Sequence, residues 1–207
     1  ASESTQIGLL NPLSQERSHL RQTLMVGLLQ TARENLRLLS RIQIFEVGGV
    51  FLPQEGETLP VEPRRLATLL TGPRQADAWQ PDQATTDYDF YDLKGRLEIL
   101  LEGLHLQSEI RWEQADILPY HPGRCASLYL GGQMLGYIGE LHPKIRSEFS
   151  LPEQPFCTAE LDLDLLLNQC QQAHQMQIIS GFTPIYEDLS VVVNQDLPVA
   201  QVLGEME

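Results

Sequence analysis

The stretch RIQIFEVGGVFLPQEG, residues 41–56, decides the fold prediction. Apolar side chains precede and follow the pair Gly48-Gly49, which predicts a buried strand that continues past a bulge or tight turn at these glycines. Residues 20–39, before the strand, carry leucines at helical spacing and predict an amphipathic helix. Gly27 interrupts this helical pattern, which indicates close packing against another backbone or a break into two shorter helices.

The composition is that of a folded protein with a single packed core. The chain has 207 residues, of which 42% are apolar and 20% charged. It contains neither an apolar run near the ~20 residues that span a bilayer nor a signal peptide, so we expect a cytoplasmic protein without a membrane contact. Cys125, Cys157 and Cys170 are widely spaced and form no CxxC motif, which predicts reduced, partly buried thiols.

The charge balance argues against a surface built mainly for nucleic acid. There are 14 basic and 28 acidic residues, a net charge of −14. Five arginines do gather at helical spacing near the beginning of the chain: Arg17, Arg21, Arg33, Arg37 and Arg41. They allow three interpretations, which are a solvated face, a patch for an acidic partner, or a minor contact with RNA.

The remaining pattern predicts antiparallel strands with a few helices, an α+β fold. Gly131-Gly132 lies between two apolar segments and indicates a β-hairpin with a two-residue turn. Asp87 or Asp89 is placed to cap the helix that follows. The predicted strands are residues 66–70, 108–113, 126–130, 133–139, 156–161 and 189–193, and the predicted helices are 90–104, 163–170 and a segment from 198 onward.

The sequence contains none of the common catalytic motifs. Phosphate-binding glycine loops of the P-loop and dinucleotide types, zinc HExxH and the GxSxG nucleophile elbow are all missing. The acidic tracts 87–92 and 160–164 each precede a predicted helix, so we interpret them as helix caps rather than as a catalytic or metal-binding pair. His142 precedes a proline at a hairpin exit and is interpreted as a turn residue. A metal site is not predicted.

Six motifs in this order resemble the beta chain of bacterial phenylalanyl-tRNA synthetase, in its catalytic-like module. They span residues 11–143 and read NPLS at 11–14, LR at 20–21 with LL at 28–29 and Asn35, FEVG at 45–48, FYDLKG at 90–95, YHPGR at 120–124 and GYIGELHP at 136–143. The resemblance implies the fold of class II aminoacyl-tRNA synthetases, an antiparallel sheet flanked by helices.

The same resemblance implies that this chain does not catalyse. In active class II enzymes an arginine just beyond the Val-Phe of the strand binds the ATP phosphate, and Leu52 stands at that position here. Glu55 has the wrong charge to replace the arginine. The later glycine-rich segment that ends in arginine is replaced by FCTAELDLDLLL, residues 156–167. Without these cations the charge of the adenylation transition state is not stabilised.

By the resemblance, the module has an architectural role. It packs on the alpha chain in an (αβ)2 heterotetramer. No catalytic, cofactor-binding or metal residues are expected in this chain, since ATP and Mg2+ belong to the holoenzyme and tRNA is bound mainly through other domains. Residues 1–181 are expected to form the catalytic-like module, truncated at its N-terminus. Residues 182–207 begin with FTPIYEDLSVVV and resemble the start of a ferredoxin-like anticodon-binding domain, also truncated, although Glu187 stands where the family usually has arginine.

Two alternatives stay open from the sequence. The first is a catalytically active class II synthetase-like amino-acid ligase, in which Arg64, Arg65 or Arg124 reaches the cleft and supplies the missing charge. The second is an RNA-binding module that uses residues 17–41 to contact tRNA. Each requires arginine side chains that are free to meet a phosphate.

Overall fold

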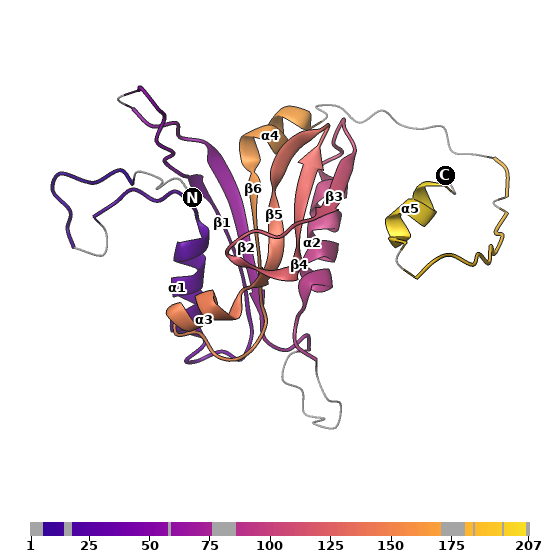
Figure 1. The fold of residues 1–207 in the computed structure, drawn as a ribbon, viewed down its shortest axis with the longest axis horizontal. Helices are drawn as coiled ribbons and strands as arrows, with labels where there is room; N and C mark the ends of the chain where they lie inside the picture. Colours follow the sequence, from indigo (N-terminus) through magenta and orange to yellow (C-terminus); the bar gives the residue numbers. More distant parts are fainter. Residues whose placement is uncertain are drawn as a thin grey trace. The chain divides into compact units, whose positions relative to one another are not determined.

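The computed structural model describes residues 6–14, 18–57, 59–75, 86–170, 181–183, 185–195 and 197–205. The chain divides into two compact units, residues 1–172 and residues 173–207. Within the described residues, the first unit contains a six-stranded sheet with helices on both faces, and the second contains one short helix, α5 (Val199–Gly204) (Figure 1).

The sheet is antiparallel throughout and has the order β1-β2-β6-β5-β4-β3. Two chain-adjacent pairs, β1 with β2 and β4 with β5, form hairpin-like units, and β6 is inserted between them. The predicted antiparallel α+β class is therefore confirmed. The strands are β1 (Ile42–Gly49), β2 (Arg64–Thr71), β3 (Ile110–Gln114), β4 (Tyr120–Leu130), β5 (Gln133–Leu141) and β6 (Phe156–Asp162).

Helices cover both faces of the sheet and divide the core in two (Figure 1). One cluster packs α1 (Met25–Asn35) and α3 (Pro143–Glu148) against one face, and we call this the α1 face. The other cluster packs α2 (Phe90–Gly103) and α4 (Leu163–Gln169) against the opposite face, called the α2 face. This division follows from the pleat, because successive side chains of a strand point to opposite faces.

Two predictions about turns and caps are confirmed. Gly131 and Gly132 have φ values of 56° and 82°, the left-handed backbone that the tight β4–β5 turn requires. Asp89 caps α2 in a capping box. Its carboxylate accepts hydrogen bonds from the backbone N–H groups of Tyr91 and Asp92, and the Asp92 carboxylate accepts one from the Asp89 N–H. His142, interpreted from the sequence as a turn residue, is the N-cap of α3, where its Nδ1 accepts a hydrogen bond from the Lys144 backbone N–H at 3.1 Å.

The first strand departs from the prediction in two ways. Its pairing with β2 runs without interruption from Ile42 to Gly49, so the predicted bulge or tight turn at Gly48-Gly49 is wrong. The strand is also not buried on both sides, because β1 lies at an edge of the sheet and Phe45 and Val47 remain 73% and 52% exposed. Local hydrophobicity does not reveal whether a strand is central or at an edge, since both can carry the same run of apolar residues.

Two further predicted elements are corrected. The helix expected over residues 20–39 is limited to α1, and an added Cβ at Gly27 would have only an ordinary contact, 3.6 Å from the Glu46 carboxylate. Gly27 therefore marks neither a tight approach of two backbones nor a break. The strand expected over residues 189–193 is not formed, and these residues have irregular backbone. A strand needs a partner, and the described residues of the second unit offer none.

Candidate functional site

A pocket that contains one of the candidate arginines, Arg65, lies on the α1 face, between the beginning of α1, the 117–120 turn and strands β2, β5 and β6. Its volume is about 360 Å³. Pairing across the strands places Glu160 opposite Tyr137 and Asp162 opposite Arg65, so that these four side chains share one face of the sheet. The polar side chains that line the pocket include Thr23, Arg65, Tyr120, Tyr137, Glu160 and Asp162.

Glu160 fastens the beginning of α1 to the sheet. One of its carboxylate oxygens, Oε2, accepts hydrogen bonds from the Thr23 hydroxyl and, at 3.2 Å, from the Leu24 backbone N–H. The Thr23 hydroxyl in turn accepts from the Met25 N–H at 3.1 Å. Helix α1 has no N-cap side chain of its own. A carboxylate at this end satisfies free N–H groups and faces the positive end of the helix dipole.

The cation in the pocket is already paired. Arg65 Nη1 lies 3.0 Å from Asp162 Oδ2, and both side chains are mostly buried. The other oxygen of Asp162 accepts a hydrogen bond from the Leu165 N–H at 2.9 Å and so caps α4. With Arg65 positive and Glu160 and Asp162 negative, the pocket walls carry one cation against two carboxylates. An incoming phosphate would meet net negative charge.

The position expected for the phosphate-binding arginine holds a packed apolar side chain. The backbone of Leu52 exchanges two 2.9 Å hydrogen bonds with Val61, and its half-buried side chain packs against the α1-face core. Glu55 is exposed in the turn that follows. Neither residue lines the pocket, and neither supplies a cation to it.

The three candidate arginines do not converge. Arg64 neighbours Arg65 on β2 and therefore points to the other face, where Nη2 lies 2.6 Å from Asp164 Oδ1. The Arg64 backbone N–H, helped by the guanidinium, lowers the pKa of Asp164. Arg124 lies 2.7 Å from the buried Glu140, which raises the pKa of the arginine, beside a separate cavity of about 630 Å³ at the start of α2. Each of the three candidate arginines therefore forms an ion pair with a carboxylate.

Burial favours the neutral forms of one hydroxyl group in the pocket and of two thiol groups elsewhere in the core. Burial raises the pKa of Tyr120, and it raises the pKa of Cys125 to about 11. Burial also raises the pKa of Cys157. Because a thiolate rather than a thiol is the nucleophile, the raised pKa values disfavour the reactive form of these cysteines at neutral pH. All three cysteines are free thiols, as predicted.

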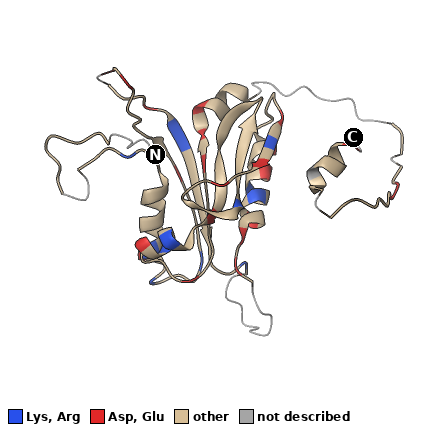
Figure 2. Ribbon diagram, in the orientation of Figure 1, with Lys and Arg blue, Asp and Glu red and all other residues tan. Residues whose placement is uncertain are grey.

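Neither a metal-binding cluster nor a membrane-spanning helix is found among the described residues. Within the described part of the chain, no group of three or more His, Cys, Asp or Glu side chains is arranged to hold a metal ion. Among those same residues, no helix is long and apolar enough to cross a membrane. Figure 2 shows acidic and basic residues interspersed along the helices.

The predicted arginine cluster is also partly engaged. Arg21 pairs with Glu46 at 2.6 Å and donates to the Gly49 carbonyl at 2.9 Å. Arg41 donates to the Arg74 carbonyl at 3.1 Å. Arg17 lies outside the described residues. The cluster therefore holds the edge strand and its neighbouring loop, at least through Arg21 and Arg41.

Sequence reasoning missed the partner of Glu160. The acidic tract 160–164 is predicted to cap the helix directly after it, and Asp162 does so. Glu160 instead binds the beginning of α1 at Thr23, 137 residues earlier in the chain. The available signal was the alternation of Glu160 and Asp162 on β6, which places both carboxylates on one face. The helix that they serve is set by tertiary structure.

Comparisons with known proteins agree with this fold. Residues 1–163 match the model for the phenylalanyl tRNA synthetase beta chain CLM domain. The phenylalanine–tRNA ligase beta subunit from Listeria monocytogenes is 34% identical over 99% of this chain, and the match covers 25% of that subunit. The beta subunit from Geobacillus kaustophilus is 36% identical over 97% of this chain, and the match again covers 25% of the subunit. The subunit from Geobacter sulfurreducens is 35% identical over 95% of this chain and 24% of its own length. The chain thus spans about a quarter of these relatives.

A solved structure supports the fold independently. Pyrrolysyl-tRNA synthetase from Desulfitobacterium hafniense superposes with a TM-score of 0.54 at 20% identity, covering 78% of this chain and 52% of that one. At this identity the likeness shows the fold alone, that of a class II tRNA synthetase domain. From the match over residues 1–163 and the beta-subunit relatives, the chain belongs to the phenylalanyl tRNA synthetase beta chain CLM domain family.

Proposed function

We propose that this chain is a non-catalytic assembly module of a phenylalanine–tRNA ligase beta subunit, and that it packs on the alpha subunit of that ligase. The family and the beta-subunit relatives support the placement in this ligase. The non-catalytic role is supported by the chemistry of the pocket on the α1 face.

The observation that carries the proposal is the ion pair between Arg65 and Asp162. Activation of an amino acid by ATP requires cations where negative charge develops on the phosphates. Arg65 is the one candidate arginine that lines this pocket, and it is paired with Asp162 beside the carboxylate of Glu160. A polyphosphate would have to separate this ion pair and then lie next to two carboxylates. The residues present do not fit ATP.

The polar groups of the pocket serve the fold instead. Glu160 and Thr23 hold α1 on the sheet, and Asp162 joins Arg65 on β2 to the start of α4. Carboxylates that are consumed in capping and ion pairs stabilise the relative positions of helices and strands. This is the arrangement that a rigid assembly module needs.

The proposal extends to the whole ligase as follows. The alpha and beta chains form an (αβ)2 heterotetramer in the cytoplasm, where ATP and Mg2+ are bound by the holoenzyme and tRNA mainly by other domains. Residues 1–181 form the catalytic-like module, and residues 182–207 begin an anticodon-binding domain of the ferredoxin-like type.

Production of this chain together with the alpha chain tests the proposal. We expect a stable complex of the two chains that survives size-exclusion chromatography and whose mass corresponds to equal numbers of each. A cytoplasmic synthetase alpha chain of a different specificity serves as the control partner and should elute separately. Separate elution of this chain and its own alpha chain at micromolar concentrations would overturn the assembly role.

A further inference from the structure

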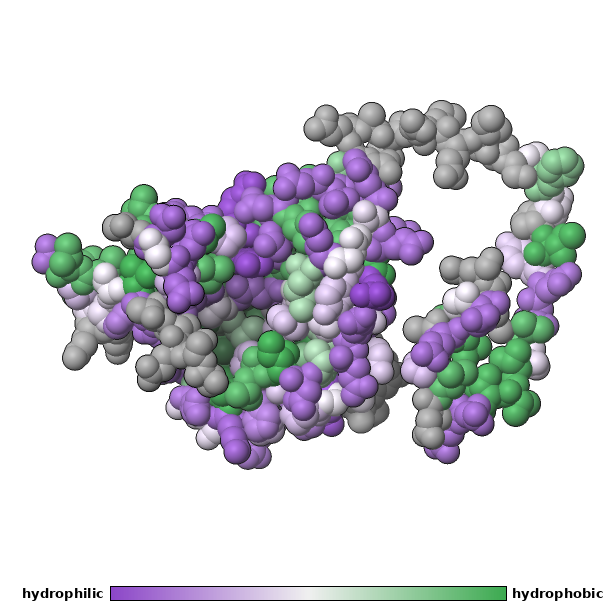
Figure 3. Space-filling view, turned by 45° about the horizontal axis from the view of Figure 1, so that its top comes forward, coloured by the Kyte–Doolittle hydropathy of each residue, from purple (hydrophilic) through white to green (hydrophobic). Residues whose placement is uncertain are grey.

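Charge distinguishes one part of the surface of the first unit from another better than apolar area does. In the view of Figure 3, apolar residues lie in separate groups among hydrophilic ones. The chain has 28 acidic residues for 14 basic ones, so most cations should find a carboxylate nearby. Seven cations do so, each in an ion pair: Arg21, Arg64, Arg65, Arg74, Lys94, Arg111 and Arg124.

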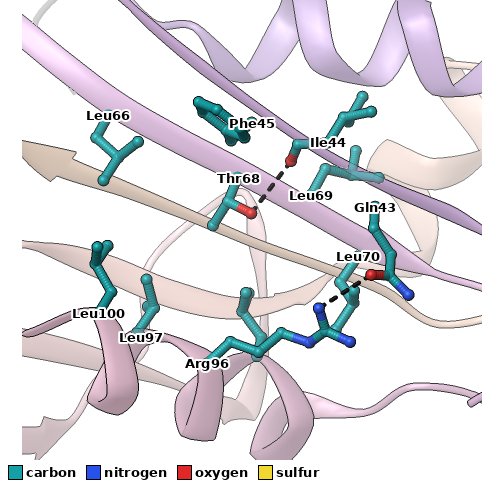
Figure 4. Close-up of a pocket in the computed structure, with 11 residues that line it drawn as sticks. Gln43, Ile44, Phe45, Leu66, Thr68, Leu69, Leu70, Arg96, Leu97 and Leu100 are labelled. Atoms are coloured by element: carbon teal, nitrogen blue, oxygen red, sulfur yellow. Dashed lines mark hydrogen bonds between the residues drawn. The ribbon is translucent and has the colours of Figure 1, made fainter. Parts of the chain in front are cut away.

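The other described cations have no ion pair among the described residues. One of them, Arg96, belongs to the α2 face, where it lines an apolar groove of about 440 Å³ and donates to the Gln43 side-chain oxygen at 3.0 Å (Figure 4). The remaining five lie together, and we call their surface the basic end. They are Arg33, Arg37, Arg41, Lys144 and Arg146.

The fold brings these five cations together from two separate segments. Arg33 is in the last turn of α1, and Arg37 and Arg41 follow the helix before β1 begins. Lys144 and Arg146 are on α3, which packs in the same core cluster as α1 and lies beside it in Figure 1. The basic end is therefore a product of the tertiary structure.

Two of the cations are fixed at the end of β2. Arg41 donates to the Arg74 carbonyl at 3.1 Å. Arg146 donates to the Gln154 carbonyl at 3.3 Å, and the Gln154 side chain donates to the Thr71 hydroxyl at 2.9 Å. Since both guanidinium groups donate to neutral carbonyls, these contacts hold them in place without neutralising their charge.

The basic end carries an excess of positive charge in an acidic chain. Residues 25–41 and 143–155 contain five cations and three carboxylates, whereas the whole chain has a net charge of −14. Arg33, Arg37 and Lys144 are exposed, so their charged groups are open to a ligand from solution. A concentration of cations of this kind favours a polyanion.

We propose that the basic end binds phosphates of the tRNA backbone as an accessory contact of the ligase. A guanidinium binds phosphate oxygens through two parallel hydrogen bonds, and a lysine adds a point charge. Contacts of this kind hold and orient a nucleic acid without reading its sequence. The relatives are subunits of a tRNA ligase, which makes tRNA the polyanion at hand. The inference rests on the proposed function and adds to it a place where tRNA touches this module.

Of the three interpretations of the N-terminal arginine cluster, the contact with RNA is thus retained for Arg33, Arg37 and Arg41. Arg21 is excluded from it, because its guanidinium is paired with Glu46.

Binding of tRNA tests the inference in a ligase assembled from the alpha chain and a full-length beta chain that contains this sequence. Arg33→Gln combined with Arg37→Gln should weaken binding about fivefold at ~50 mM salt, and the slope of log affinity against log salt should become shallower by about 1–2. The matched control, Arg64→Gln with Arg111→Gln, removes the same charge from exposed arginines that have carboxylate partners, and it should change neither quantity. Equal losses in the two double variants would show that only net charge matters and would overturn the inference.

Photo-cross-linking in the same ligase identifies what lies against the basic end. Benzoylphenylalanine replaces Leu38, which is 89% exposed and follows Arg37, and the control places it at Tyr91 on α2, which is 74% exposed. We expect cross-links to tRNA from position 38 and none from position 91. Cross-links from position 38 to the alpha chain or to another segment of the beta chain would show that protein covers the basic end, and would overturn the inference.

The outcomes separate this inference from the proposed function. If the unaltered chain does not bind the alpha chain, the assembly role itself fails. If the assembled ligase binds tRNA and the variant at Arg33 and Arg37 binds it equally well with the same salt slope, the assembly role stands and the tRNA contact is wrong. Melting temperatures of all variants, compared with the unaltered protein, identify any loss of binding that comes from unfolding.

Discussion

Removal of the Glu160 carboxylate should detach the beginning of α1 from the sheet. In Glu160→Ala, the Thr23 hydroxyl and the Leu24 N–H both lose their acceptor, and α1 has no N-cap side chain to replace it. Hydrogen bonds to a charged group contribute about 1.5–3 kcal/mol each, and the loss of an N-cap costs about 1 kcal/mol. Because the site is half-buried and the contributions overlap, we expect a loss of about 2–3 kcal/mol in the free energy of unfolding.

Urea unfolding of this chain, followed by far-ultraviolet circular dichroism, measures the loss. Glu160→Gln keeps an acceptor of the same shape and should cost about 1 kcal/mol, chiefly from the lost charge at the helix terminus. Glu153→Ala is the control, because Glu153 is exposed in a loop, and its effect should stay within about 0.5 kcal/mol.

A double-mutant cycle isolates the contact itself. Thr23→Val removes the donor, and combined with Glu160→Ala it should cost clearly less than the sum of the two single changes, by about 1 kcal/mol, since both remove the same hydrogen bond. A stability of Glu160→Ala equal to that of Glu153→Ala, or strict additivity with Thr23→Val, would refute the reasoning that Glu160 is committed to the fold.

Three further predictions follow from other contacts. Leu52→Arg should not create ATP binding in calorimetric titrations up to millimolar ATP, because Glu160 and Asp162 still make the α1-face pocket negative and Arg65 stays paired. Gly136→Ala should lower the free energy of unfolding by about 3 kcal/mol or more in urea titrations, since its Cβ would lie 2.1 Å from the Glu160 carbonyl oxygen. Asp92 should show a pKa below that of a free aspartate in carboxyl NMR titrations: burial opposes the ionised form, but the Asp89 N–H and Arg74 outweigh it. A group with a lowered folded pKa stabilises above its unfolded pKa of about 3.9 and loses this contribution as the pH falls through the folded value, so Asp92→Asn should reduce the acid sensitivity of unfolding below about pH 4.

The elements that the sequence predicts well are those defined by local chemistry. Asp89 before an apolar helical stripe marks the start of α2, and Gly131-Gly132 between apolar segments marks the β4–β5 turn. In both cases the residues that decide the structure are neighbours in the chain, so no knowledge of the tertiary fold is required.

The predictions that failed depend on distant neighbours. Whether β1 is central or at an edge is set by the strand order, which alternation along residues 42–49 does not contain. Whether Arg65 is free to bind a phosphate is set by its register opposite Asp162, a residue nearly a hundred positions away. The replacement of the expected arginine by Leu52 was visible in the sequence, but the pairing of the remaining arginines required the structure.

The most direct test of the central claim is adenylate formation, measured as phenylalanine-dependent exchange of pyrophosphate into ATP by this chain alone. The account predicts a rate no higher than that of buffer, because Leu52 carries no charge and Arg65 is held by Asp162. Exchange above buffer that requires phenylalanine, persists through repeated purification and disappears in Arg65→Ala would contradict it.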